Sequence, residues 1–136
     1  MTEQALAGLR ILDLSTGLAG AAGAKLLADF GAEVIKVEPP DGDCARHLGP
    51  YPGDVRDPER SALFLNYHRN KLGITLDIFR PEGRALLDRL IAQVDAVILQ
   101  FTPEQIEALR LDYASLARVN PAIVVTAITP WGFTGP

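Results

Sequence analysis

Two features near the start of the chain could bind the phosphates and ribose of a nucleotide. Gly17, Gly20 and Gly23 follow an apolar run that ends at Leu14. Backbone N–H groups at a turn where a strand passes into a helix can bind a phosphate. Glu38 lies 21 residues after Gly17, near the spacing at which dinucleotide-binding folds place a carboxylate on a ribose. The spacing is G-x-x-G-x-x-G and not G-x-G-x-x-G, so close helix–sheet packing and a surface carboxylate are the alternative interpretations.

The other reactive side chains do not form a complete catalytic set. Cys44 lies near Arg46 and His47, and a thiolate nucleophile needs such a base or positive field, although a bystander thiol is the simpler interpretation. Arg69 and Lys71 could reach a phosphate or could form a solvated basic turn. The sequence has no G-x-S-x-G motif and no spacing of ligands typical of a metal site, so we expect no metal.

The composition excludes several classes of protein. The 136 residues suffice for one domain with a hydrophobic core, and 17 acidic against 13 basic residues give a net charge of −4 without a basic patch for nucleic acid. No apolar run approaches the roughly 20 residues that span a bilayer, and residues 1–4 do not begin a signal peptide. The single cysteine allows no disulfide within the chain. We therefore predict a cytoplasmic protein that binds neither nucleic acid nor a membrane.

Alternating strands and helices must hold the candidate residues in place. Apolar runs predict strands at 10–14, 34–38, 74–77, 96–99 and 123–128. Helical spacing predicts helices at 19–30, 61–66 and 81–94, and Thr102 and Asp112 each cap a further helix. Residues 39–60 form a long proline-rich loop of the kind that is often functional. This order predicts an α/β fold with a doubly wound parallel sheet of about five strands.

The first helix has one apolar face with helical spacing, small at its start and large at its end. Small residues let a helix begin close against a sheet or a ligand. This face consists of Ala19, Ala22, Gly23, Leu26, Leu27 and Phe30.

Several stretches together resemble the family III CoA-transferases, which include formyl-CoA transferase, the carnitine CoA-transferases and α-methylacyl-CoA racemase. The resemblance begins at about Leu6 and covers nearly all of the chain, but only the opening part of the family's usual length. The stretches that carry it are LAGLRILDL at 6–14, LLADFGAEVIKVE at 26–38, RNK at 69–71, ITLD at 74–77, PEGR at 81–84, NP at 120–121 and GFTGP at 132–136.

This resemblance implies a Rossmann-like domain that binds coenzyme A, in a cytoplasmic homodimer that acts on an acyl-CoA and a carboxylic acid acceptor. In the transferases an Asp carboxylate attacks the thioester, giving an acyl anhydride and then an aspartyl-CoA thioester, whereas the racemases move an α-proton with an acid/base pair. Both catalytic sets lie beyond the position that matches Pro136. We therefore expect residues 1–136 to be an N-terminal CoA-binding segment of a longer protein, or a truncated form of one, with no catalytic residue and no activity alone.

The resemblance also transfers the family's CoA contacts to particular positions of this sequence. Some members have Arg where this chain has Pro39 or Ala108, and Lys where it has Phe79, so fewer cations here could pair with the CoA phosphates. The predicted CoA contacts are Leu18, Ala19, Pro39, Leu76, Asp77, Gln100, Phe101, Thr102 and Leu109.

Two alternatives remain beside a CoA-transferase segment. One is the corresponding segment of an acyl-CoA racemase. The other is a degenerate copy that serves as a non-catalytic structural or dimerisation module. A nicotinamide-dependent oxidoreductase is disfavoured by the missing G-x-G-x-x-G.

Overall fold

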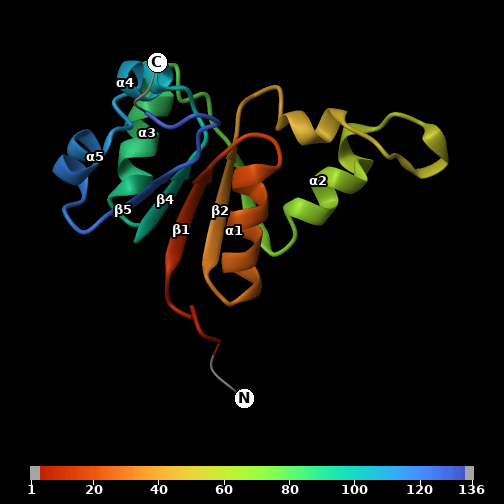
Figure 1. Cartoon of the computed structure of the whole chain (residues 1–136), viewed down its shortest axis with the longest axis horizontal. Coiled ribbons are helices and arrows are strands. Elements are labelled where there is room, and N and C mark those ends of the chain that lie inside the picture. The colour runs from red at the N-terminus through yellow and green to blue at the C-terminus, as the bar shows by residue number, and fades with distance from the viewer. Residues whose placement is uncertain (1–3, 134–136) are drawn as a thin grey trace.

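A computed structural model describes residues 4–133 and shows an α/β fold built on five parallel strands (Figure 1). The strand order is β3-β2-β1-β4-β5, which is the order of a Rossmann-like sheet and confirms the predicted fold class. The strands are β1 (Arg10–Leu14), β2 (Glu33–Glu38), β3 (Lys71–Thr75), β4 (Ala96–Leu99) and β5 (Val124–Ala127).

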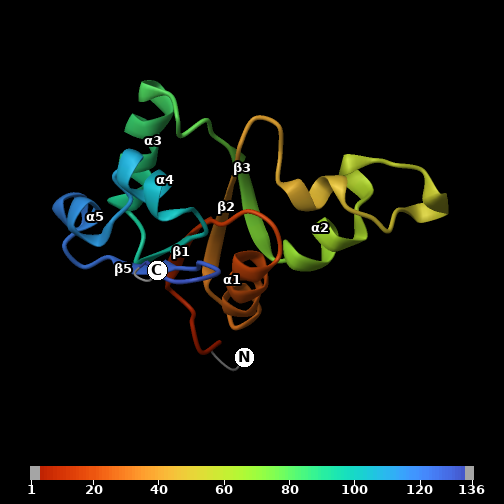
Figure 2. The same ribbon diagram turned by 45° about the horizontal axis from the view of Figure 1, so that its top comes forward.

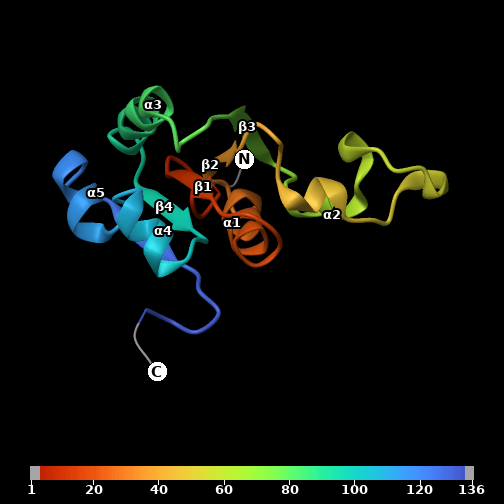
Figure 3. The same cartoon turned by 90° about the horizontal axis from the view of Figure 1, so that it is seen from above.

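Helices cover both faces of the sheet. Seen from above, α1 and α2 lie on one face and α3 and α5 on the other (Figure 3). The short helix α4 lies at the end of the sheet where the strands finish (Figure 1). The helices are α1 (Ala19–Asp29), α2 (Ala62–Tyr67), α3 (Pro81–Ile91), α4 (Pro103–Ala108) and α5 (Tyr113–Val119).

Local capping chemistry begins two of these helices as the sequence predicts. Thr102 forms a capping box at α4, since its hydroxyl accepts from the N–H of Gln105 and the side chain of Gln105 accepts from the N–H of Thr102. The carboxylate of Asp112 caps α5 by accepting from the N–H of Ser115 at 2.9 Å. These contacts satisfy backbone donors that the first helical turn leaves without partners.

The face of α1 that packs on the sheet differs from its apolar stripe. The residues that α1 buries against the sheet are small, because the helix lies so close to β1 that a Cβ on Gly20 would overlap the side chain of Ser15. Leu26 and Phe30 instead point away from the sheet and are 57% and 58% exposed. The buried residues of α1 are Gly20, Ala21, Ala24 and Ala28.

The third strand begins earlier than the sequence predicts. It runs from Lys71 to Thr75 rather than over 74–77, because it pairs with β2 from Val34 opposite Lys71 to Glu38 opposite Thr75. Lys71, for which a solvated basic turn was one interpretation, is therefore the first residue of this strand. Asp77, which was predicted to end this strand, instead lies beyond it.

The segment between β2 and α2 projects to one side of the molecule (Figure 2). Three short 3-10 helices give it local structure, so it is more ordered than the loop that the prolines predict. Its central contact is Arg46, whose guanidinium carbon lies 3.6 Å from the centroid of the Phe64 ring and which pairs with Glu38 and Glu59. The three 3-10 helices are Cys44–His47, Pro52–Asp54 and Pro58–Arg60.

Candidate functional site

The carboxyl ends of the first four strands surround a small apolar hollow of about 80 Å³. In open α/β sheets, ligands bind at this edge of the sheet. Four of the nine predicted CoA contacts meet here although they follow three different strands. They are Pro39 after β2, Leu76 and Asp77 after β3, and Phe101 after β4.

The turn between β1 and α1 lies beside this hollow. Thr16 lines it, whereas the predicted contacts Leu18 and Ala19 are exposed at the start of α1. The N–H of Gly20 donates to the side-chain oxygen of Gln100 at 3.0 Å. The close approach at Gly20 also supports the packing interpretation of the glycine turn.

The remaining predicted contacts are distributed over three places. Gln100 binds the first turn of α1, Thr102 caps α4, and Leu109 lines a separate cavity beside α3 and α5. Thr102 and Gln100 thus make structural hydrogen bonds within the fold. Of the nine predicted contacts, Pro39, Leu76, Asp77 and Phe101 are the ones that line the hollow.

Glu38 is neither a free ribose ligand nor a surface carboxylate. Its two oxygens accept from Arg46 at 2.6 and 2.9 Å, and the N–H of Asp43 donates to it at 2.9 Å. Burial alone would raise the pKa of this carboxyl, but the hydrogen bonds from Arg46 and Asp43 outweigh it and hold the pKa below its usual value. Glu38 therefore fixes the segment after β2 to the sheet.

Lys71 belongs to a buried network of charges, which contradicts both interpretations of it as a phosphate ligand or a solvated turn. Its ammonium group donates to Asp13 at 2.8 Å, and both side chains are almost wholly buried. A second buried pair joins Lys36 to Asp43 at 2.9 Å. Burial opposes ionisation of Asp13, yet Lys36 and Lys71 hold its pKa below the usual value. Asp13 also accepts from the N–H of Ser15, so it supports the turn after β1.

His68 closes this network on the α2 side. Its ring stacks on Phe64 with centroids 4.4 Å apart, and its Nδ1 lies 3.4 Å from the Lys71 ammonium. Burial and the nearby positive charges lower the pKa of His68 to about 4, so the ring is neutral at pH 7. Burial and the neighbouring Asp43 raise the pKa of the Cys44 thiol. Cys44 is therefore not an activated nucleophile.

Sequence reasoning missed a second, larger cavity of about 780 Å³ between α3, α4 and α5. It shares Ile78 and Phe79 with the apolar hollow, so the two spaces adjoin. The one local feature of the sequence that points to this cavity is the i, i+4 spacing of Arg80 and Arg84 at the start of α3. The arginines that line this cavity are Arg80, Arg84, Arg110 and Arg118.

Neither a metal centre nor a membrane span is found in the part of the chain that the structure describes. Within residues 4–133, no three His, Cys, Asp or Glu side chains gather closely enough to hold a metal ion. No helix in the same range combines the length and apolarity needed to cross a bilayer.

Comparison with known proteins gives consistent matches. The model of a family described as CoA-transferase family III matches residues 6–136. Succinyl-CoA–D-citramalate CoA-transferase of Chloroflexus aurantiacus is 42% identical over 94% of this chain and 31% of its own length. Succinate–glutarate CoA-transferase of Agrobacterium fabrum is 40% identical over 96% of the chain and 34% of its own length. The crystal structure of a CAIB/BAIF family protein from Brucella suis, at 39% identity, superposes with a TM-score of 0.88 over 99% of this chain and 36% of that one. The chain thus spans about a third of the length of these relatives.

Proposed function

The chain belongs to CoA-transferase family III, and on this basis we propose that it is the coenzyme A-binding part of an enzyme that transfers CoA from an acyl-CoA to a carboxylic acid. The observation that carries the proposal is the apolar hollow at the strand ends, with Pro39, Leu76 and Phe101 in its wall. The pantetheine arm of CoA is narrow and largely uncharged, so it suits a small hollow of this kind. The relatives named above are CoA-transferases, which supports transfer over racemisation.

The chemistry that we propose for the whole enzyme is covalent catalysis by an aspartate. The carboxylate attacks the thioester carbonyl and expels the CoA thiolate, which leaves an acyl anhydride. The thiolate then attacks the aspartyl carbonyl of the anhydride, so that the acyl group leaves as its free acid and an aspartyl-CoA thioester remains. The acceptor carboxylate attacks this thioester and expels the CoA thiolate, which leaves a second anhydride. The thiolate then attacks the acceptor's acyl carbonyl, so that the new acyl-CoA forms and the aspartate carboxylate is released.

The aspartates at the candidate site are unsuited to that role. Asp13 is buried against Lys71. The two oxygens of Asp77 accept from the N–H of Phe79 and from Nε of Arg80. We therefore assign the nucleophile to a residue outside this chain and expect the 136 residues alone to be inactive. The cytoplasmic location and the homodimer belong to the same proposal for the whole protein.

Calorimetric titration of the chain with CoA tests the binding role. Thr16→Phe would fill the hollow from the β1 side, and we expect it to weaken CoA binding by about tenfold or more. Thr126→Phe is the matched control, because Thr126 is exposed on β5 and lies outside the hollow. The same preparation is assayed for exchange of CoA between an acyl-CoA and free carboxylic acids.

Three results would each contradict a part of the proposal. Absence of CoA binding by the wild-type chain would favour the non-catalytic structural module. Equal CoA affinities of Thr16→Phe and Thr126→Phe would remove the hollow from the binding site. Measurable exchange by the wild-type chain would contradict the assignment of the nucleophile to a residue outside it.

A further inference from the structure

The turn between β1 and α1 is held in place by buried charged side chains. Its residues Ser15, Thr16 and Gly17 pass beside the apolar hollow, and Thr16 forms part of the hollow's wall. The N–H of Ser15 donates to Asp13 at 3.0 Å, and the carbonyl oxygen of Ser15 accepts from the ammonium group of Lys36. Both backbone groups of Ser15 are thus bound by side chains that are themselves buried. Thr16 therefore follows a residue whose position is fixed.

Asp43 joins this turn to the projecting segment. Its Oδ1 accepts from the N–H of Gly17 at 3.2 Å and from the N–H of Ala45 at 2.8 Å. The first bond reaches back 26 residues to the turn, whereas the second caps the 3-10 helix that opens the projecting segment. The N–H of Asp43 donates to Glu38 at 2.9 Å. One fully buried residue thus connects the turn after β1, the end of β2 and the start of the projecting segment, which lie side by side (Figure 1).

The backbone at Gly17 is the part of the turn that most needs an external contact. Gly17 has a φ of 82°, in the left-handed region that favours glycine. A glycine backbone has more conformational freedom to lose than that of any other residue, so a defined conformation there requires a partner that holds it. Asp43 supplies this partner through its bond to the N–H of Gly17. Because Thr16 directly precedes Gly17, the same bond sets where the Thr16 side chain lies in the wall of the hollow.

The charge of Asp43 serves this contact. Its Oδ2 lies 2.9 Å from the ammonium group of Lys36. Burial opposes ionisation of Asp43, but Lys36 and the N–H groups of Ala45 and Gly17 outweigh it and hold the pKa below its usual value. An ionised carboxylate accepts stronger hydrogen bonds than a neutral group. Replacing a buried ion pair by apolar residues of similar volume is often neutral or stabilising, so stability alone does not account for a carboxylate here. The directed bond to Gly17 does account for it, because an apolar side chain has no acceptor.

We propose that Asp43 is a positioning residue, which shapes the hollow for the pantetheine arm of CoA by holding Gly17 and, through it, Thr16. Asp43 is not among the residues that line the hollow, so it acts on the ligand only through the turn. The identity of the ligand rests on the proposed function. The positioning itself rests on the bond between Asp43 and the N–H of Gly17, which can be measured without a ligand.

The test compares two double variants that share Lys36→Met and differ at Asp43. The first adds Asp43→Asn, which removes the charge but keeps a side-chain oxygen for the N–H of Gly17. The second adds Asp43→Ala, which removes the oxygen as well. Both variants are free of an unpaired buried charge at this pair, and both lose the bond from Lys36 to Ser15 equally. Amide hydrogen exchange of Gly17, measured by NMR without a ligand, reports the bond, and calorimetric titration with CoA reports the hollow.

Ser61→Ala is the matched control. The Ser61 hydroxyl is buried, donates to the carbonyl of Ala45 at 2.7 Å and accepts from the N–H of Phe64 at 3.2 Å. Its removal loosens the projecting segment but leaves the bond between Asp43 and Gly17 in place. The control therefore separates an effect through the turn from an effect through the projecting segment. Thermal unfolding of each variant confirms that it is folded under the conditions of the titration.

We expect the Gly17 amide to exchange about tenfold faster in the second double variant than in the first, and CoA to bind the second about tenfold more weakly. Ser61→Ala should bind CoA as the wild type does. Faster exchange in the second variant would support the positioning of the turn even if the wild-type chain does not bind CoA, in which case only the proposed function fails. The inference is overturned if the folded double variants show equal exchange at Gly17, if they bind CoA equally tightly, or if Ser61→Ala weakens CoA binding as much as the second variant does.

Discussion

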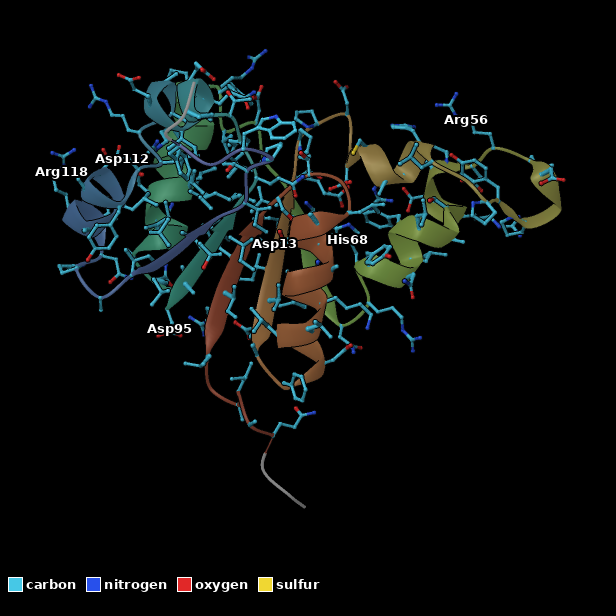
Figure 4. The ribbon with its side chains drawn as sticks, viewed as in Figure 1. Asp13, Arg56, His68, Asp95, Asp112 and Arg118 are labelled. Carbon is cyan, nitrogen blue, oxygen red and sulfur yellow. The ribbon has the colours of Figure 1, made fainter. Side chains whose placement is uncertain are left out.

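The two faces of the sheet use their charged side chains in opposite ways. On the α1 side, Asp13 pairs with Lys71 and Lys36 with Asp43, and all four side chains are almost wholly buried. On the α3 and α5 side, arginines such as Arg118 line an open cavity, and their guanidinium groups are only partly neutralised. Figure 4 shows this contrast, with Asp13 within the fold and Arg118 at its surface.

The difference between these faces shows how a charge can be assigned to folding or to binding. A charge removed from water is tolerated only when partners compensate for its lost hydration, so the Asp13–Lys71 pair is part of the fold. An exposed guanidinium group has no such requirement and can remain unpaired until a ligand arrives. Lys71, for which the sequence left open a phosphate ligand or a solvated turn, therefore belongs to the charges that hold the fold, and Arg118 belongs to those that are free to bind.

Removing one partner from the buried network should give the largest effect. In Lys71→Met, Asp13 loses its nearest cation while it remains buried, and we expect the free energy of unfolding to fall by about 3–5 kcal/mol. Urea denaturation measures this loss. Lys25→Met is the control, since Lys25 pairs with Asp29 on the surface of α1 and such pairs contribute about 0–1 kcal/mol. Equal losses in the two variants would show that burial does not distinguish the two kinds of charge.

The pH dependence of stability should give an intermediate effect. Burial, Lys71 and Lys36 lower the pKa of His68 from 6.5 to about 4, although Asp43 and Asp13 oppose this shift. Between these two pH values the unfolded chain takes up a proton at His68 that the folded chain does not. The contribution of the neutral His68 to the free energy of unfolding is therefore fully present above pH 6.5, and it is lost progressively as the pH falls toward 4.

We expect the free energy of unfolding to fall by on the order of 2 kcal/mol between pH 7 and pH 4.5. Urea denaturation at several pH values measures the slope. His68→Gln should remove this slope whatever its effect on stability at pH 7. The lowered pKa values of Asp13, Asp43 and Glu38 affect stability mainly below about pH 4.5, where these groups are protonated in the unfolded chain, so most of the slope above this pH belongs to His68. A variant that retains the wild-type slope would contradict the assignment.

The sequence predicts those parts of the fold that depend on local pattern. Apolar runs located four of the five strands and placed the third strand too late in the chain. Thr102 and Asp112 located the starts of α4 and α5, because a cap and its partners lie within one turn. The packing face of α1 was not predictable in this way. Leu26 and Phe30 make the more apolar stripe, but the short distance between helix and sheet at Gly20 selects the small residues instead.

The candidate site shows the same limit. The resemblance to the family named Pro39, Leu76 and Phe101 as CoA contacts, and the fold brings them together because the carboxyl ends of parallel strands meet at one edge. The partner of Lys71 is 58 residues away, and Arg84 meets the turn at Arg110 across 26 residues, so neither contact has a local signature. The family's contact positions hold fewer cations in this chain, whereas the four arginines that the fold gathers in one cavity lie at other positions.

The smallest expected effect on stability, and the sharpest test of the comparison, comes from Arg110. Its left-handed backbone disfavours any residue with a Cβ, whereas glycine adopts it freely. Arg110→Gly should therefore raise the free energy of unfolding by about 0.5 kcal/mol while it removes a charge from the cavity. Urea denaturation measures the free energy of unfolding, and pyrophosphate titration of the same preparation measures the affinity of the cavity. Arg110→Gln removes the charge but keeps a side chain with a Cβ, so it separates the loss of charge from the relief of strain. A residue that lowers stability and raises affinity serves binding, so a clear loss of stability in both variants would instead place Arg110 with Lys71 among the charges that hold the fold together.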